Sequence, residues 1–524
     1  MSPSFIPLHL QPQSDIPLYA QLRDQMRALV HSGELRPGDR IPASRELAAQ
    51  LKIHRTTVAT AYAELESEGL IEGFVGKGTY ISVKNGAREF TPAPRQPGGA
   101  LRWESLFADE RAGEGLSRLM PQVADDTIAF VNAKPSENSF PVEEVRKCAN
   151  EVLKREGRGI LQLGSSDGYG PLREVLLTNL RAEGIAAKEN NLLVTDGCQQ
   201  SLDLLAKAFL RTGDAVIVEN PTYPGVLSVL SQARVRCLPA PVDTHRFGQP
   251  YAGLDVNAVE SALEQNRVKL IVVTPDFQNP TGTTLPAEAR KKLLDVAAYF
   301  QVPVVEDHIY ARLRLRGTAV PSLKAMDRNG IVIQIDSFSK IAFPGLRVGW
   351  CVGPERVIER LRQLKQVSDL HTDQLSQATL AEFAKSGMLE KHLKRMIGVY
   401  ARRLDAIEKS MERHLPAGVQ WTRPEGGMSL WITLPPGLDA AELLIHAREK
   451  GVLFVPGRYF YVGSPLPNTL RLGFAGVEEK DIARGILTLG QVIQSELAKK
   501  QRGASRRSET AEGPRAGASR VPLI

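Results

Sequence analysis

Apolar residues recur at helical spacing near the start of the chain and predict three helices. The first covers about 17–30, where the apolar positions are Leu18, Leu22, Met26, Leu29 and Val30. A second, short helix begins near Ser44, a plausible N-cap, and a third covers about 55–68 and ends at Gly69. Residues 52–54 form a tight turn between the last two helices. This order of elements predicts a helix-turn-helix.

Two short strand-like runs follow at 70–71 and 79–81, on either side of a glycine-rich turn. They predict a β-hairpin, or wing, next to the helix-turn-helix. The second helix of a helix-turn-helix can enter the DNA major groove by its N-terminal end. Residues 55–57 lie at that end, and Arg and Thr are residue types that contact base edges and phosphates. A three-helix protein-binding module is the alternative, but it does not account for the wing.

From about 128 to 495, apolar runs alternate with helical patterns, which predicts an α/β domain with a mainly parallel sheet. Buried strands are expected at 192–194, 215–218, 270–274, 302–305 and 331–335. Polar or aromatic residues follow each of these runs. Because ligands of such sheets bind beyond the carboxyl ends of the strands, we expect those residues to gather at one edge.

A smaller α+β part is expected near the end of the chain. From about residue 441 the pattern predicts a helix, a strand at 452–455, another strand around Arg471 and a last helix to about residue 497. Residues 498–524 are rich in Arg, Ser, Gly and Ala and have little to bury, so they predict a disordered basic tail.

The polar residues at the predicted sheet edge have the chemistry of a site for a pyridine aldehyde phosphate. Lys340 follows the last strand, and a lysine whose pKa is lowered by burial can form a Schiff base with an aldehyde. Asp307 can keep the ring nitrogen protonated, and Tyr223 offers a face for stacking. The other candidates are Asn279 and Tyr310 at the ring hydroxyl, and Ser337, Ser339, Arg347 and the backbone of Cys198 and Gln199 at the phosphate. Taken alone, Lys340 could equally be a solvated loop residue.

The N-terminal part resembles the winged helix of GntR-type bacterial repressors. The most specific match is the block 33–48, which reads GELRPGDRIPASRELA. The resemblance implies a domain over 15–83 that binds double-stranded operator DNA. It implies DNA contacts from Arg45, Arg55, Thr56, Thr57, Gly76 and Lys77. His54 stands where the family usually has Ser, so the contact at that position stays open.

Four motifs of the larger part resemble class I aminotransferases of fold type I. They are NPTG at 279–282, DHIY at 307–310, SFSK at 337–340 and PGLRVG at 344–349. The resemblance implies a domain over 123–497 that binds pyridoxal 5′-phosphate through Lys340, with the other residues in the roles given above. It also implies that Arg471 binds the α-carboxylate of an amino acid.

A winged helix joined by a linker, here 84–122, to such a domain resembles the MocR group of regulators and implies a domain-swapped homodimer. We therefore expect a cytoplasmic transcription regulator that senses an amine, an amino acid or pyridoxal phosphate through the Lys340 aldimine. The alternatives are an active aminotransferase that carries a DNA-binding arm and a scaffold that has lost the cofactor.

Two departures from the family pattern favour the regulator. Leu163 stands where the family usually has a Tyr that reaches the neighbouring subunit's cofactor phosphate. Asn132 and Ala133 stand where it usually has two glycines.

The predicted fold is multi-domain: an N-terminal α+β winged helix-turn-helix, then an α/β domain of the pyridoxal-phosphate-dependent transferase fold type I with its small C-terminal α+β subdomain. The composition agrees, since 524 residues, 42% hydrophobic and 24% charged, describe a globular protein of several domains. The net charge of +7 permits nucleic-acid binding without requiring it. Four scattered cysteines without a CxxC pair predict no metal site. The sequence contains neither the pattern of a signal peptide nor an apolar run long enough to span a membrane, so neither feature is predicted.

Overall fold

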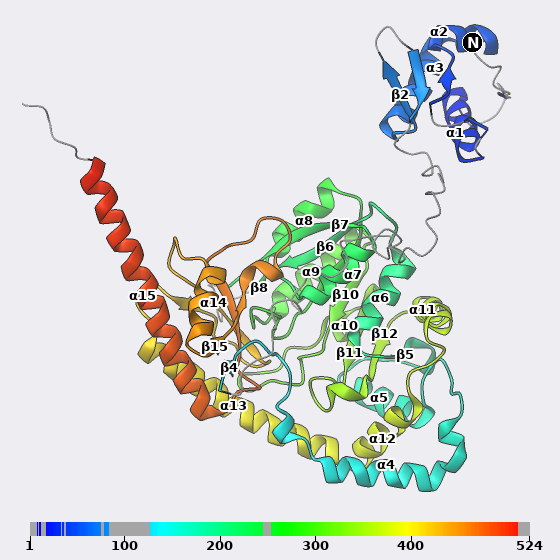
Figure 1. Cartoon of the computed structure of the whole chain (residues 1–524). Coiled ribbons are helices and arrows are strands. Elements are labelled where there is room, and N and C mark those ends of the chain that lie inside the picture. Colours follow the sequence, from blue (N-terminus) through cyan, green and yellow to red (C-terminus); the bar gives the residue numbers. More distant parts are fainter. Residues whose placement is uncertain are drawn as a thin grey trace, which may run out of the picture. The chain divides into compact units, whose positions relative to one another are not determined.

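The computed structural model describes residues 8, 10–11, 17–32, 34–35, 38–74, 78–82, 126–244 and 253–511. The chain divides into two units, 1–108 and 109–524, and each is described by itself (Figure 1). The predicted linker, 84–122, lies outside the described residues.

The first unit is a small helical domain with a hairpin. Its elements are α1 (Leu18–Ser32), β1 (Arg40–Ile41), α2 (Ser44–Leu51), α3 (Arg55–Ser67), β2 (Ile71–Phe74) and β3 (Gly78–Ile81). Leu22 and Met26 of α1 pack with Val58 and Leu65 of α3 in one apolar core, and all four side chains are fully buried. The antiparallel β2–β3 hairpin confirms the predicted wing. Strand β1 beside β3 was not predicted, because two residues are too few to carry a period.

The predicted N-cap at Ser44 is wrong, because α2 begins at Ser44 and Ala43 occupies the cap position. The Glu46 carboxylate accepts a hydrogen bond from the Ala43 backbone N–H at 3.1 Å, so a side chain inside the helix secures its start. Helix α3 is capped by His54, whose Nδ1 accepts a hydrogen bond from the Thr56 backbone N–H at 3.4 Å.

The second unit is built on an eight-stranded sheet of order β5-β12-β11-β10-β9-β6-β7-β8. The strands are β5 (Leu192–Thr195), β6 (Ala215–Asn220), β7 (Arg236–Asp243), β8 (Gly253–Leu254), β9 (Val268–Val273), β10 (Val304–Asp307), β11 (Val332–Ser337) and β12 (Gly349–Val352). Strands β7, β6, β9, β10 and β11 are parallel, which confirms the expected mainly parallel sheet. Strands β12 and β8 are antiparallel to their neighbours.

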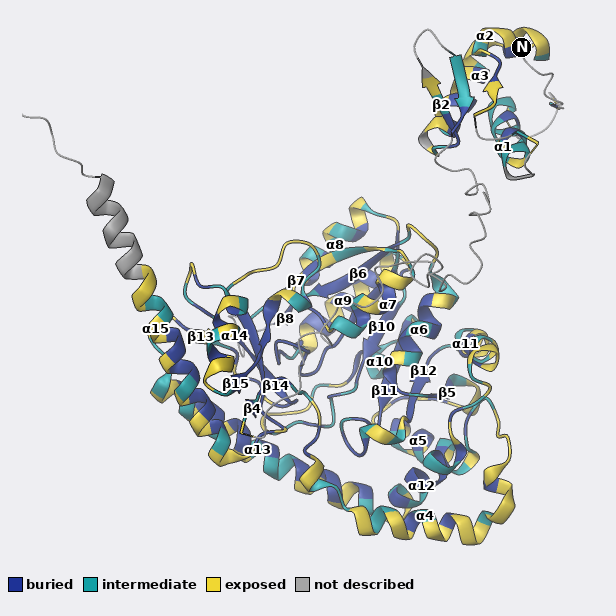
Figure 2. Cartoon of the chain, in the orientation of Figure 1, coloured by how far each residue is buried: buried dark blue, intermediate teal, exposed yellow. Residues whose placement is uncertain are grey.

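Helices cover both faces of this sheet (Figure 2). Leu193, Val272 and Ile335 point to a core that they share with α6 (Cys198–Phe209), α7 (Pro224–Gln232) and α11 (Glu355–Ser368). On the central strands the alternate residues, such as Ile271 and Val273 of β9, point to the other face, where α8 (Val256–Gln265), α9 (Ala287–Tyr299) and α10 (Leu323–Met326) complete a second core. This alternation of side chains fixes which residues can reach the sheet edge.

A smaller sheet of order β13-β14-β17-β16 packs beside the large one. The remaining strands are β4 (Ile128–Ala129), β13 (Gln420–Trp421), β14 (Ser429–Thr433), β15 (Val452–Leu453), β16 (Val455–Pro456) and β17 (Thr469–Gly473). The predicted single strand at 452–455 is wrong. The chain changes sheets at Phe454, so that β15 pairs with β4 and β16 pairs with β17. A continuous apolar run does not reveal such a change of partner.

Long helices enclose the second unit. The remaining helices are α4 (Val142–Glu156), α5 (Gly170–Ala182), α12 (Gln374–Lys385), α13 (Met388–His414), α14 (Ala440–Glu449) and α15 (Glu479–Ala511), with short 3-10 turns at Glu137–Ser139, Gly157–Leu161, Glu189–Asn191, Pro344–Leu346 and Gly457–Phe460. None of the helices in the described part of the chain combines the length and the apolar composition that a membrane span requires.

The last helix was expected to end near residue 497, with a disordered tail from 498. This prediction is wrong for residues 498–511, because α15 continues to Ala511. Ala, Lys, Arg, Gln and Glu are good helix formers, and extending an anchored helix costs less than starting one. Residues 512–524 lie outside the described part.

Candidate functional site

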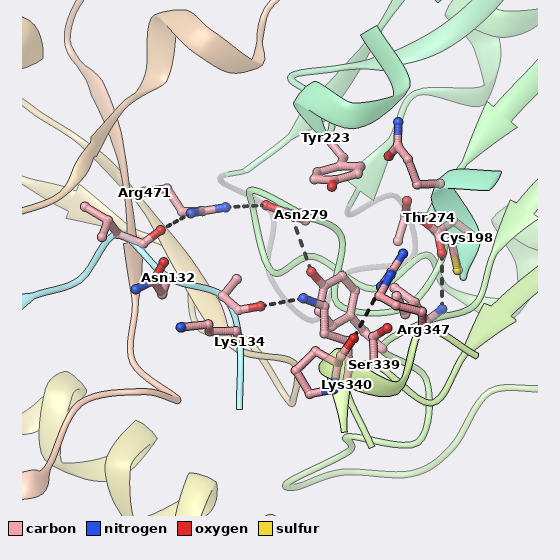
Figure 3. Close-up of a pocket in the computed structure, with 17 residues that line it drawn as sticks. Asn132, Lys134, Cys198, Tyr223, Thr274, Asn279, Ser339, Lys340, Arg347 and Arg471 are labelled. Atoms are coloured by element: carbon pink, nitrogen blue, oxygen red, sulfur yellow. Dashed lines mark hydrogen bonds between the residues drawn. The ribbon is translucent and has the colours of Figure 1, made fainter. Parts of the chain in front are cut away.

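A pocket of about 330 Å³ lies at the carboxyl ends of the central strands (Figure 3). Ten of the predicted residues line it: Cys198, Gln199, Tyr223, Asn279, Asp307, Tyr310, Ser339, Lys340, Arg347 and Arg471. They come from six different segments of the sequence. Strand direction in the large sheet brings nine of them together, as the parallel pattern predicts, and Arg471 reaches the pocket from another sheet.

Lys340 follows β11 and points into the pocket. Its Nζ donates a hydrogen bond to the Ala133 backbone carbonyl at 2.8 Å, across 207 residues of sequence (Figure 3). The amine also lies 5.9 Å from the centre of the Tyr310 ring. Burial lowers the pKa of Lys340 to about 8, and the positive charge of Arg471 contributes to the same shift. The amine is therefore a better nucleophile at neutral pH than an ordinary lysine.

This pKa predicts how capture of an aldehyde depends on pH. Below about pH 8 the amine is mostly protonated and has no lone pair to react, whereas above it the neutral amine predominates. The rate of covalent capture of pyridoxal phosphate by the cofactor-free protein should rise with pH and level off slightly above pH 8, as measured by absorbance. A rate that keeps rising to the ordinary lysine value of about 10.4 would contradict this environment.

Asp307 ends β10 and is buried at the base of the pocket. Burial raises the pKa of its carboxyl to about 7, although the Ile309 backbone N–H donates a hydrogen bond to it at 3.3 Å. Its neighbour Glu306 points to the opposite face and accepts N–H groups from Leu323 and Lys324. The strand pleat thus separates a structural carboxylate from one that is available to a positively charged ring nitrogen.

Arg347 and the start of α6 form a cradle for an anion. A guanidinium N–H of Arg347 donates to the Asp196 carbonyl at 2.6 Å, next to Gly197, whose φ is +93°. A Cβ at Gly197 would lie 3.1 Å from the guanidinium, and one at Gly349 would lie 2.6 Å from the Gly197 Cα. Two glycines therefore let the backbone come this close. The free N–H groups at the start of α6 and the fixed cation suit a phosphate.

Ser337 and Ser339, which lie just before Lys340 in the sequence, have different positions. Ser339 lines the pocket, but Ser337 does not. The two hydroxyls lie 2.8 Å apart, and the Ser337 hydroxyl also donates to the Val348 carbonyl at 2.9 Å. Ser337 therefore holds Ser339 and the turn in place, and the structure does not bring it to the phosphate cradle as the sequence had suggested.

Arg471 reaches the pocket from β17 in the small sheet and is fully surrounded by protein. Its guanidinium donates to the Asn279 side-chain oxygen at 3.0 Å and to the Val131 carbonyl at 2.5 Å (Figure 3). The Asn279 amide in turn donates to the Tyr310 hydroxyl at 3.4 Å. Burial lowers the pKa of Arg471 to about 10, so it stays charged at neutral pH. Among the described residues, the buried Nε of Arg471 has no hydrogen-bond partner.

Tyr223, Cys198 and Gln199 lie at the rim. Tyr223 precedes α7, lines the pocket and exposes 38% of its surface. Cys198 begins α6, and burial keeps the pKa of its thiol far above the ordinary value, so it is neutral. The Gln199 side chain donates to the Gly225 carbonyl at 3.3 Å, which ties the start of α6 to α7.

Sequence reasoning missed several residues of the pocket. They are Val131, Asn132, Ala133, Lys134, Thr274, Ile309 and Pro344. Thr274 directly follows β9, so the rule about strand ends could have found it. Residues 131–134 carry no chemical signal of their own, and only the departure at 132–133 pointed to that segment. The described residues contain no cluster of His, Cys, Asp or Glu arranged to hold a metal ion.

Of the predicted DNA-contacting residues, Arg55, Thr56 and Thr57 begin α3 of the first unit, and Arg45 lies in the first turn of α2. Arg45, Arg55 and Thr56 are exposed, and Thr57 is half-buried. The capping of α3 by His54 orders the segment that carries three of them. Gly76 and Lys77, assigned to the wing tip, lie outside the described residues.

Two family models match the chain. "Aminotransferase class I and II" matches residues 131–489, and "Bacterial regulatory proteins, gntR family" matches residues 18–81. The two matched segments correspond to the two units of the fold.

Similar proteins include regulators that match both units. The HTH-type transcriptional regulator TauR of Rhodobacter capsulatus is 32% identical, with 93% of this chain and 98% of TauR covered. The probable rhizopine catabolism regulatory protein MocR of Rhizobium meliloti is 28% identical, with 92% and 95% covered. The crystal structure of LysN, an α-aminoadipate aminotransferase from Thermus thermophilus, in complex with N-(5′-phosphopyridoxyl)-L-leucine, superposes with a TM-score of 0.68. It is 34% identical and covers 76% of this chain and all of LysN.

Proposed function

The chain belongs to the aminotransferase class I and II family and carries a gntR-family DNA-binding domain, and on this basis we propose that it is a pyridoxal-phosphate-dependent transcription regulator of the MocR type. It binds operator DNA in the cytoplasm through the winged helix. Its aminotransferase-like unit senses an amino acid or a related amine. Relatives named as regulators match nearly the whole chain, which supports this function over a free-standing aminotransferase.

Pyridoxal phosphate fits the donors of the pocket. Lys340 would bind its aldehyde carbon, Asp307 its ring nitrogen, and Arg347 with the start of α6 its phosphate, where the glycines at 197 and 349 leave room. The paired Asn279 and Tyr310 would hold the ring hydroxyl. When bound, the cofactor supplies an electron sink for negative charge at the α-carbon of an amine.

The observation that carries the choice of ligand is the unpaired Nε of Arg471. An unsatisfied N–H on a buried guanidinium is costly, and a carboxylate is the group that this planar donor binds best. The Arg471 and Lys340 side chains both line the same pocket. A ligand with a primary amine and a carboxylate on the same carbon satisfies both, which supports an α-amino acid as the effector.

The same two residues link the two parts of the second unit. Lys340 contacts Ala133, and Arg471 contacts Asn279, so each contact joins the small sheet region to the large sheet. An effector that binds Arg471 and displaces the Lys340 amine changes both contacts at once. A ligand shifts an equilibrium only by its different affinity for two states, and these contacts supply such a difference.

A homodimer is part of the proposal. Leu161, Leu163 and Leu370 are apolar and expose between 56% and 72% of their surface. Gly164 lies against the Gln374 side chain, which brings the first two close to the segment that carries the third. Apolar side chains gathered in this way favour association with a second copy.

The test is a titration of operator DNA with amino acids, read together with cofactor absorbance. We expect one α-amino acid to change operator affinity by about 5- to 150-fold, in step with the absorbance change and without turnover. Catalytic conversion of the cofactor with unchanged DNA affinity would instead favour an active aminotransferase. An Arg55→Ala variant serves as control, since it should lose operator affinity and keep the absorbance response.

A further inference from the structure

A second charged region lies at the opposite edge of the large sheet from the cofactor pocket. It is a hollow of about 720 Å³ whose charged lining residues are Lys207, Arg211, Arg267, Lys269, Arg360 and Asp214. We refer to it as the basic hollow. Strands β6 and β9 begin here, at Ala215 and Val268, whereas the cofactor pocket lies where these strands end. The basic hollow is therefore a separate site from the pocket.

The five cations of the basic hollow come from different elements. Lys207 lies in the last turn of α6, and Arg360 lies on α11. Arg211 lies between α6 and β6, and Arg267 immediately precedes β9. Because the fold itself brings these segments together, the concentration of charge is a property of the folded unit and not of one basic run.

Most of this positive charge is not neutralised within the protein. Asp214 is the one carboxylate in the described lining, and it accepts a hydrogen bond from the backbone N–H of Arg211 at 2.8 Å. Lys207 pairs with Asp203 at 2.7 Å. In the described part of the chain, the side chains of Arg211, Arg267 and Lys269 have no carboxylate partner within ion-pair distance.

Like charges held around one hollow repel each other, so this arrangement does not stabilise the fold. The cations are mostly exposed and carry long side chains, which suits an extended anion better than a small enclosed one. Duplex DNA presents about one phosphate charge per 1.7 Å of its axis. A chain that carries a DNA-binding domain also keeps DNA at high local concentration near its other surfaces.

We propose that the basic hollow binds the phosphate backbone of duplex DNA and is a second DNA-contacting surface of this chain, in addition to the winged helix. It contributes affinity without reading sequence, because Lys and Arg contacts to phosphates carry no direct sequence information. Its binding free energy is therefore strongly dependent on salt.

The test compares two full-length holoproteins that carry the same net charge. One has Lys207→Gln, Arg211→Gln, Arg267→Gln and Lys269→Gln. The matched control has four exposed cations replaced elsewhere, Lys154→Gln, Lys291→Gln, Arg402→Gln and Arg484→Gln, each of which has an ion-pair partner. Affinity for an operator duplex with long flanks is measured over a range of salt concentrations.

Each phosphate contact contributes about 0.9 to the slope of log affinity against log salt. The slope of the hollow variant should therefore be smaller by about 2 to 4, and that of the control should not change. Equal slopes in the two variants would overturn the proposal. If the fourfold variant fails to fold, as judged by cofactor absorbance and thermal unfolding, Arg267→Gln alone should reduce the slope by about 1.

A second measurement separates this inference from the regulatory function. In an Arg55→Ala background, binding to a duplex of unrelated sequence should persist at low salt and should be lost when the four hollow cations are also replaced. That result supports the hollow even if no amino acid alters operator binding. Loss of all duplex binding with Arg55→Ala alone would show that the hollow does not bind DNA. Competition by inorganic phosphate at low millimolar concentration, with no effect of DNA length, would also overturn the proposal in favour of a small-anion site.

Discussion

Replacement of Lys340 by alanine should abolish covalent attachment of pyridoxal phosphate to the chain. Lys340 is the lysine whose amine lies within the cluster of Asp307, Tyr310 and Arg471, and burial lowers its pKa to about 8. Alanine has no amine to bind the aldehyde. Mass spectrometry after borohydride reduction should therefore find no cofactor on the variant, and operator affinity should no longer respond to amino acids.

Lys134→Ala is the matched control for this experiment, because Lys134 lines the same pocket but is half exposed and pairs with Glu137 at 3.2 Å. The control should retain the covalently bound cofactor. Both variants should bind operator DNA without effector as the natural chain does, because the first unit has its own core. If Lys340→Ala leaves the absorbance spectrum unchanged, the cofactor is held elsewhere or is not bound, and the sensor mechanism is wrong.

Arg471→Leu should weaken the response to α-amino acids by about 30- to 1,000-fold in effector concentration. Removing one partner of a buried, hydrogen-bonded charge pair costs about 2 to 4 kcal/mol, and about 1.4 kcal/mol corresponds to a factor of ten. Arg471 is fully buried, and its pKa of about 10 keeps it positively charged at pH 7. Effector titrations of operator binding measure the shift.

Two comparisons make this result specific to a carboxylate. Amines that lack a carboxylate should be bound equally by the natural chain and by Arg471→Leu. Arg471→Lys keeps the charge but loses the planar set of donors, so it should recover only part of the response. If Arg471→Leu responds to amino acids as the natural chain does, the effector carboxylate is not bound at this position, and the effector class must be reconsidered.

The large sheet could be predicted because buried parallel strands appear as continuous apolar runs. All five predicted runs correspond to strands, with ends that differ by at most two residues. Strand β7 was missed because it contains Pro239 and Pro241, and proline argues against a sheet interior. It lies near the sheet edge, where only the two residues of β8 follow it. The position of β7 in the folded sheet therefore outweighs the low strand propensity of its two prolines.

The cofactor side of the pocket could be predicted for a related reason. Asp307 ends a strand, Lys340 and Asn279 follow strands, and parallel strands end at one edge. The opposite wall could not be predicted, because residues 131–134 belong to no helix or strand and carry no chemical signal of their own. Only the three-dimensional packing of β4 and β17 places that segment opposite Lys340. Likewise, no local pattern separates Ser339, which faces the pocket, from Ser337, which binds Val348.

The order in which the ribosome makes the chain bears on the contact between Arg471 and Val131, which spans 340 residues. Domains generally fold as units, beginning with the N-terminal one during synthesis. The core of the first unit uses residues up to Ile81 only, so this unit can fold long before β17 emerges. A chain terminated before Thr469 would bind the operator but lack Arg471. Such truncated products would compete with the complete protein for its DNA sites while remaining insensitive to the effector.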